Sequence, residues 1–290
     1  MAKYDAKAAL PGGDPGPWGD SVTISYNVRD VLLYAVGIGI SDLRYVYENH
    51  PGFSVFPTFA IRWGGIGVPV DSNLIPHSPG PLNIDAERYL EVLWPLPTSG
   101  SVSVRSRLIG VHPKGKGNGF CEYESVVTDS DGNDCIRMVN GSFRRGVEQL
   151  GDIEPFEGSG ETYSQKIVVP DTDPTTVTSV EIAENQANTY RLSGDYNSLH
   201  IDPEAAKFGG FDSPILHGLC TFGHCAQRLL DEMCDGDSGR FRRIKVRFSS
   251  PVYPGDTMEI RAWNESSTRV IFEAKVGDSV VVSNAYFEFA

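Results

Sequence analysis

Residues 214–248 read PILHGLCTFGHCAQRLLDEMCDGDSGRFRRIKVRF, and the periodicity of this stretch changes after Gly239. Before that point apolar residues recur at helical spacing over 214–233, with Pro214 at the start. After it, apolar and cationic residues alternate from 243 to 248, which is typical of a β-strand. The stretch therefore predicts a long helix followed by a strand.

Further strand patterns occur in the sequence both before and after this helix. A second, shorter helix is predicted over 180–192, where apolar residues again recur at helical spacing. A long helix followed by antiparallel strands predicts an α+β fold in which a curved sheet wraps around one helix. The other predicted strands cover residues 101–111, 120–129, 135–144, 258–263, 270–276 and 280–289.

The two halves of the chain resemble each other. The sequence YAVGIG at 34–39 lies 156 positions before YRLSGD at 190–195, and weaker matches follow in the same order. The polar, Gly-rich stretch 151–161 is the best linker candidate. We therefore predict a duplication, with one repeat in residues 1–155 and a second repeat in residues 156–290.

Composition limits the partners. The 290 residues carry 25 Lys and Arg against 38 Asp and Glu, for a formal net charge of −13, so neither nucleic acid nor a membrane is expected as a partner. No apolar run is long enough to cross a bilayer, and the five cysteines are not spaced like a secreted disulfide scaffold. These features predict a soluble intracellular protein. The C-terminal residues FEFA are not a peroxisomal tripeptide signal, which leaves peroxisome and cytoplasm as alternatives.

The densest set of reactive side chains is Asp195, Asn197 and His200, in a short run between Gly194 and Pro203. Such a run predicts a turn, and a carboxylate, an amide and an imidazole together can bind and orient one water molecule. Histidine can also exchange a proton near neutral pH. The alternative is an Asx-type turn and helix cap with a bystander histidine.

Continued through PILHGLCTFG at 214–223, this run resembles the hydratase 2 motif of the MaoC-like (R)-specific enoyl-CoA hydratases. The resemblance includes DLRYVYE at 42–48 and FPTF at 56–59, so it spans nearly the whole chain. It implies a double hot-dog fold, in which each of two repeats has a long helix wrapped by an antiparallel sheet. It also implies reversible hydration of trans-2-enoyl-CoA to (3R)-3-hydroxyacyl-CoA in fatty acid metabolism. No metal and no redox cofactor are implied, because coenzyme A is part of the substrate.

The resemblance assigns catalytic roles to four residues. Asp195 and His200 would be the acid/base pair that holds the water attacking C3 of the enoyl thioester, and Asn197 would position that water. Gly218 would offer its backbone N–H to the thioester oxygen, where a donor at a helix start stabilises enolate-like charge. Gly39 stands where the second repeat has Asp195, so the first repeat is expected to be catalytically empty and to accommodate the acyl chain.

Five cations between 240 and 247 stand out in an acidic chain, and coenzyme A carries phosphates that Arg and Lys bind well. An exposed strand face is the alternative. In the family, Asp85-Ala86 would often be His-Gly, so no role is assigned to those two residues. The residues predicted to bind the coenzyme or acyl group, partly from the resemblance, are Lys114, Gly115, Arg243, Lys245, Arg247 and Phe248.

Three alternatives compete with this hypothesis. His217, Cys220, His224 and Cys225 look like a metal set, but core packing of a buried helix explains the cysteines more simply. A hot-dog acyl-CoA thioesterase would release free coenzyme A. A non-catalytic acyl-CoA-binding module would bind without turnover. A homodimer is also expected, because hot-dog sheets present edges that can pair.

Overall fold

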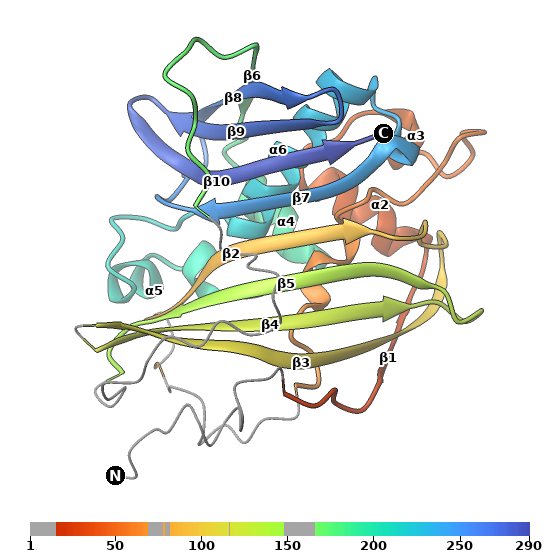
Figure 1. The fold of residues 1–290 in the computed structure, drawn as a ribbon, viewed down its shortest axis with the longest axis horizontal. Helices are drawn as coiled ribbons and strands as arrows, with labels where there is room; N and C mark the ends of the chain where they lie inside the picture. The colour runs from red at the N-terminus through yellow and green to blue at the C-terminus, as the bar shows by residue number, and fades with distance from the viewer. Residues whose placement is uncertain (1–15, 69–77, 79–81, 116, 148–165) are drawn as a thin grey trace.

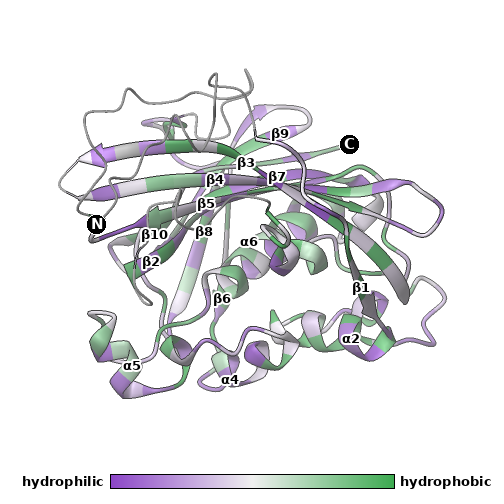
Figure 2. Cartoon of the chain, turned by 90° about the horizontal axis from the view of Figure 1, so that it is seen from below, coloured by the Kyte–Doolittle hydropathy of each residue, from purple (hydrophilic) through white to green (hydrophobic). Residues whose placement is uncertain are grey.

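The computed structural model describes residues 16–68, 78, 82–115, 117–147 and 166–290. Ten antiparallel strands form one curved sheet, and the helices gather on a single face of it (Figures 1 and 2). The strand order is β1-β3-β4-β5-β2-β7-β10-β9-β8-β6. The predicted linker and the predicted repeat boundary lie outside the described residues, so the boundary stays a prediction.

The strands are longer than the sequence patterns indicated, and β1, β2 and β6 were not predicted. The strands are β1 (Val22–Tyr26), β2 (Asn83–Val92), β3 (Gly100–Gly115), β4 (Asn118–Thr128), β5 (Asp134–Arg144), β6 (Thr176–Glu181), β7 (Phe241–Phe248), β8 (Thr257–Ser266), β9 (Arg269–Val276) and β10 (Ser279–Phe289). The α-helices are α2 (Val28–Gly37), α3 (Leu43–Val46), α4 (Gln186–Tyr190), α5 (Pro203–Phe208) and α6 (Gly218–Cys234). The 3-10 segments are η2 (Phe59–Trp63), η4 (Arg191–Ser193), η5 (Ser198–His200) and η6 (Ser238–Arg240).

The sheet is nearly symmetric about its centre, where β2 of the first half pairs with β7 of the second half (Figure 1). Each half contributes five strands in mirrored order. Tyr89 lies directly opposite Lys245, and the two are separated by the same offset as the sequence repeat. Tyr34 and Tyr190, which the repeat also equates, pack with ring centroids 6.2 Å apart. Equivalent residues that meet each other mark a pseudo-two-fold axis, and the double hot-dog fold is confirmed.

The two halves differ in their helices. Helix α6 has 17 residues and lies in the concavity of the sheet, whereas the 10-residue α2 of the first half corresponds to α4 and η4, and the described part of that half has only the five-residue η2 in a place comparable to α6. The expected long helix is thus seen in the second repeat alone among the described residues. Helix α2 approaches α6 closely, since a Cβ on Gly223 would lie 2.5 Å from the Ile38 side chain. That contact requires glycine.

Two predicted helices need correction. The helix predicted from Pro214 begins at Gly218, because the Leu216 N–H bonds to the Val252 carbonyl at 2.7 Å and holds the preceding residues extended. The helix predicted over 180–192 is β6 up to Glu181, followed by a loop, α4 and η4. The β-branched run from Thr176 pairs with β8, and such residues favour strands.

The hydrophobic core lies between the concave face of the sheet and these helices. It joins both halves into one cluster, since Tyr34, Phe59 and Leu90 of the first half and Phe222 and Phe287 of the second half are fully buried in it. Among the described helices, none combines the length and the apolar character needed to cross a membrane.

Candidate active site

A loop of the second half presents the predicted catalytic residues. Gly194 ends η4 with φ +118, and the Arg62 guanidinium of the first half packs so close that a Cβ there would lie 2.7 Å from its Nη1. Only glycine fits this left-handed turn, which turns the chain toward Asp195. The Asn197 side chain accepts from the Leu199 N–H at 3.1 Å and caps η5. The Asx turn considered as the alternative is therefore real, and it is part of the same site.

His200 is 9% exposed and has a fixed tautomer. Its Nδ1 lies 2.9 Å from the carbonyl oxygen of Ile215, which can only accept, so Nδ1 carries the proton and Nε2 keeps its lone pair. Burial lowers the pKa of His200, although the Ile215 bond and the charges of Asp195 and Asp85 oppose this shift. The imidazole is thus neutral at pH 7 and can accept a proton through Nε2.

His217 is a site residue that the sequence reasoning considered only as a metal ligand. Its ring is fully buried and stacks on the His200 ring, with centroids 3.8 Å apart and planes 27° apart. Its Nε2 donates to the backbone carbonyl of Asp195 at 3.2 Å. Burial lowers its pKa to about 4, so it is neutral at pH 7. Its position directly before Gly218 at the helix start was the signal that could have revealed it.

Gly218 is the first residue of α6, so its N–H belongs to the helix-start amides that have no partner within the helix. The aligned peptide dipoles of 17 residues stand behind it and favour negative charge at this point. Phe248 of β7 packs beside it, and a Cβ on Gly218 would lie 3.3 Å from the Phe248 ring. The arrangement forms a donor site for an anionic oxygen.

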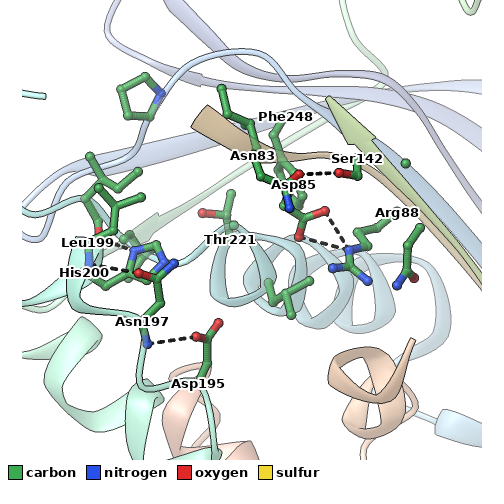
Figure 3. A pocket seen from close by; sticks show the side chains of 18 of the residues that line it. Asn83, Asp85, Arg88, Ser142, Asp195, Asn197, Leu199, His200, Thr221 and Phe248 are labelled. Carbon is green, nitrogen blue, oxygen red and sulfur yellow. Dashed lines mark hydrogen bonds and ion pairs between the residues drawn. The ribbon is translucent and has the colours of Figure 1, made fainter. Parts of the chain in front are cut away.

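A cavity of about 690 Å³ brings these residues together (Figure 3). Residues of both halves line it. The second half contributes Asp195, Asn197, His200, Gly218, Thr221 and Phe248, and the first half contributes Gly64, Gly65, Asp85, Arg88, Asn140 and Ser142. All four predicted catalytic residues and Phe248 therefore share one cavity.

The first-half wall of this cavity carries an ion pair to which the sequence reasoning assigned no role. Arg88 Nε donates to both carboxylate oxygens of Asp85, at 2.8 and 3.0 Å. Burial raises the pKa of Asp85, and the Arg88 charge opposes the shift. A β-bulge between Asp85 and Glu87 allows residues three apart to face the same side, whereas regular alternation would separate them. No sequence pattern revealed that bulge.

The predicted cationic strand residues lie on the other face of the sheet. Arg243 pairs with Glu91 at 2.8 Å, and Arg247 and Lys245 both approach Glu87. They do not line the cavity, and carboxylates from β2 balance their charge. Successive side chains of β7 point to opposite faces of the sheet. Phe248 therefore points toward the cavity, and Arg243, Lys245 and Arg247 point to the opposite face. Their role in binding coenzyme A stays a prediction.

Lys114 and Gly115 also lie away from the cavity. Both residues are exposed at the end of β3. The Lys114 ammonium lies 5.5 Å from the centroid of the Phe120 ring. Their contact with the ligand stays a prediction as well.

The residues considered as a metal set separate in the structure. Burial raises the pKa of the Cys220 and Cys225 thiols, so both are neutral core groups. His224 packs against Gly39, and of the four residues His217 is the one that stacks on the catalytic-loop residue His200. His217 does form a different group, because Asp195, His200 and His217 each place one possible ligand atom within 4.8 Å of the others.

A double hot-dog fold with an Asp-Asn-His loop facing a helix start across one cavity defines a MaoC-like protein. The MaoC like domain matches residues 165–285, and the MFE-2 hydratase 2 N-terminal domain matches residues 24–146. The chain belongs to the MaoC-like hydratase 2 family.

Named relatives agree with this membership. The chain is similar to peroxisomal multifunctional enzyme type 2 of Mus musculus, with 37% identity over 289 residues that cover 92% of this chain but only 37% of that protein. It is similar to enoyl-CoA hydratase 2, peroxisomal, of Arabidopsis thaliana, with 34% identity over 87% of this chain and 86% of the relative. The crystal structure of a MaoC-like dehydratase from Phytophthora capsici superposes with a TM-score of 0.84 at 35% identity, covering 99% of this chain and 98% of that one.

Proposed function

We propose that this protein is a hydro-lyase that reversibly hydrates trans-2-enoyl-CoA to (3R)-3-hydroxyacyl-CoA in fatty acid metabolism. The observation that carries the proposal is the convergence of Asp195, His200 and Gly218 on one cavity. The names of the relatives support the same reaction class. The (3R) stereochemistry rests on the family resemblance.

In the proposed reaction, Asp195 and His200 hold a water molecule whose oxygen attacks C3 of the enoyl group. One proton of the water passes to this pair, and the pair returns one proton to C2. As the C3–O bond forms, negative charge develops on the thioester oxygen, and the Gly218 N–H stabilises it. The neutral Nε2 of His200 is suited to accept the proton.

His217 supports this mechanism as a positioning residue. It packs against the His200 ring, donates to the Asp195 carbonyl and directly precedes Gly218. One buried, neutral imidazole thus touches or adjoins His200, Asp195 and Gly218. This contact set fixes the distances on which proton transfer depends.

The first half supports the proposed place for the acyl group. In its described residues, the short η2 and the glycines at 64 and 65 occupy the region beside the cavity, and no long helix fills that space. The cavity therefore extends from the catalytic loop into the first half. The proposal that this half accommodates the acyl chain rests on that extension.

The decisive test compares Asp195→Ala and His200→Ala with Asp202→Ala, which lies in the same loop but caps α5. We expect the first two changes to lower kcat for hydration of a trans-2-enoyl-CoA by about 10²–10⁴-fold, the usual range for a lost acid or base. Asp202→Ala should retain the rate, and all three variants should show cooperative unfolding. Equal rates in all three would contradict the assignment.

The same assay separates the alternatives. Release of a free thiol from saturated acyl-CoA would indicate a thioesterase, and tight binding without turnover would indicate a binding module. The proposed reaction uses no metal and no redox cofactor. Loss of activity after treatment with a chelator, restored by a divalent ion, would instead assign the Asp195, His200 and His217 group to a metal.

Assembly and location are proposals of the same kind. Strands β1 and β6 end the described sheet, and such edges can pair with a second copy, so we propose a homodimer. Light scattering after size-exclusion chromatography would measure the mass of the particle in solution.

Both named relatives above are called peroxisomal, and imaging of a tagged full chain would decide between peroxisome and cytoplasm.

A further inference from the structure

The first half gives the cavity a polar wall, which we define as Asp85, Arg88 and Asn140. Arg88 and Asn140 lie directly opposite each other on paired strands β2 and β5, and Asp85 joins them through its ion pair with Arg88. Asp85 and Arg88 face the catalytic loop across the cavity (Figure 3). A cavity for a plain hydrocarbon chain does not require this wall.

Two polar atoms of the wall lack partners. Arg88 Nη1 and Asn140 Oδ1 are buried and make no hydrogen bond within the described part of the chain. Asn140 is only 7% exposed, and the Arg88 side chain is 13% exposed. Buried donors and acceptors are nearly always paired, since an unmade hydrogen bond there is costly. Both residues line the cavity, so these side chains can serve a ligand that supplies an acceptor and a donor once they turn toward it.

The charges already present at the wall favour a neutral ligand group over a charged one. The Arg88 guanidinium is already balanced by the Asp85 carboxylate, which accepts two bonds from Arg88 Nε. A second carboxylate would meet Asp85 and the nearby Asp195, which already influence each other electrostatically. A neutral group such as a hydroxyl or a carbonyl accepts from Arg88 Nη1 without adding charge, and a hydroxyl can also donate to Asn140.

The position of the wall points to the acyl end of the substrate. The nucleotide of coenzyme A carries several charges and has to remain near solvent, because burying unpaired charge is costly. Asn140 is buried and the Arg88 side chain is largely so, and both line the cavity together with the glycines at 64 and 65 in the first half. A group that reaches them extends from the thioester at Gly218 into the first half.

We propose that Asp85, Arg88 and Asn140 form a subsite for a neutral oxygen function, a hydroxyl or a carbonyl, on the acyl group of the thioester. This inference rests on the proposed function and specifies its substrate class. The preferred substrates are oxygenated 2-enoyl thioesters rather than enoyl thioesters with a plain hydrocarbon tail.

The test uses a positional series of hydroxy- and keto-substituted trans-2-enoyl-CoAs beside the unsubstituted compound of equal length. We expect the wild-type protein to prefer one oxygenated compound by about 10–100-fold in kcat/KM, the value of one or two buried hydrogen bonds. Arg88→Lys keeps the charge beside Asp85 but removes the forked donor, and Asn140→Leu keeps the shape but removes the acceptor. Each change should reduce the preference to about 1–3-fold, because the loss in kcat/KM for the oxygenated compound should exceed any loss for the plain compound by about 10-fold or more.

Arg105→Lys is the matched control, since Arg105 lies over the Trp18 ring at 4.9 Å and does not line the cavity. It should change neither rate nor preference. Equal turnover of plain and oxygenated substrates by the wild-type protein would overturn the proposal. Equal losses for both substrates in Arg88→Lys and Asn140→Leu would also overturn it, because the wall would then contact a part that all substrates share.

Truncated thioesters distinguish the acyl group from the pantetheine arm, which also carries neutral oxygens. On N-acetylcysteamine thioesters, a retained preference for the oxygenated acyl group supports the proposal, and a preference that disappears overturns it. Calorimetric binding of saturated acyl-CoA with and without the oxygen tests the subsite without turnover. A protein that hydrates nothing but binds the oxygenated compound more tightly would contradict the proposed function alone.

Discussion

Gly39 of the first half and Asp195 of the second half occupy equivalent places in the repeat, but their surroundings are opposite. Asp195 lies beside the cavity. Gly39 has φ +76, and a Cβ there would lie 2.7 Å from Cε1 of His224, a side chain of α6. In the first half, both the carboxylate and the space around it are missing, because the helix that forms the second site fills the first. A duplicated site is thus lost through packing as well as through the change of one residue.

The largest expected effect follows from restoring that side chain. Gly39→Asp would add a charged group against the buried His224 ring in a left-handed backbone conformation. We expect a loss of about 3–5 kcal/mol in the free energy of unfolding, measured by denaturant titration, and no second active site.

Gly132→Asp is the control for the cost of placing an aspartate in a left-handed backbone conformation. Gly132 has φ +89 and nothing within 4 Å of a Cβ, so its cost should be only about 1 kcal/mol. Equal losses in the two variants would show that the His224 contact does not close the first site.

The next effect concerns the half that kept its site. His217→Phe retains a ring against His200 but removes the donor to the Asp195 carbonyl, whereas His217→Asn retains a donor but loses the stack. We expect each to lower kcat by about 10–100-fold with KM changed much less, because misplaced groups slow the chemical step. Steady-state kinetics check this. Unchanged kcat in both variants would remove His217 from the machinery.

Lowering the pH should destabilise the protein through one buried histidine at the active site and another at the closed site. His217 beside the active site, and His224, which reaches from α6 to Gly39 at the closed site, both have a pKa lowered to about 4 by burial. Between pH 6.5 and 4 the unfolded chain binds more protons than the folded chain, so stability falls as pH falls through this window. The loss should reach about 1–3 kcal/mol for each histidine. Unfolding titrations across this range should show a shallower slope for His224→Leu, and an identical slope would contradict the cause.

The smallest effect is a shift in the pH profile of hydration. Because burial lowers the pKa of His200, the acidic limb of kcat/KM should lie below pH 6.5. The Asp85 carboxylate raises that pKa, so Asp85→Asn should move the limb to still lower pH. A limb that moves upward would show that Asp85 does not act on His200 through its charge.

The sequence predicted the features that depend on periodicity and local motifs. The duplication and the strands β7 to β10 were visible because repeated and alternating patterns carry them, whereas the joint roles of the Asp195 loop and Gly218 came from the family resemblance. The Asp85–Arg88 wall was not visible, since it depends on a bulge that shifts register within β2. The outward position of Arg243 and Arg247 depends on which face of β7 meets the helices, and alternation alone does not say which.

The pairing of Tyr89 with Lys245 has a consequence for biosynthesis. Strand β2 must wait for β7, which follows roughly 150 residues later, so at about 5–20 residues per second its edge stays open on the ribosome for roughly 10–30 s. An open edge of a nearly finished sheet invites wrong partners. Glu87 and Glu91, which later pair with the cations of β7, place negative charge on that edge during the interval. The carboxylates that later form the ion pairs at the centre of the mature sheet therefore also keep the open edge of the nascent first repeat charged until its own second half arrives.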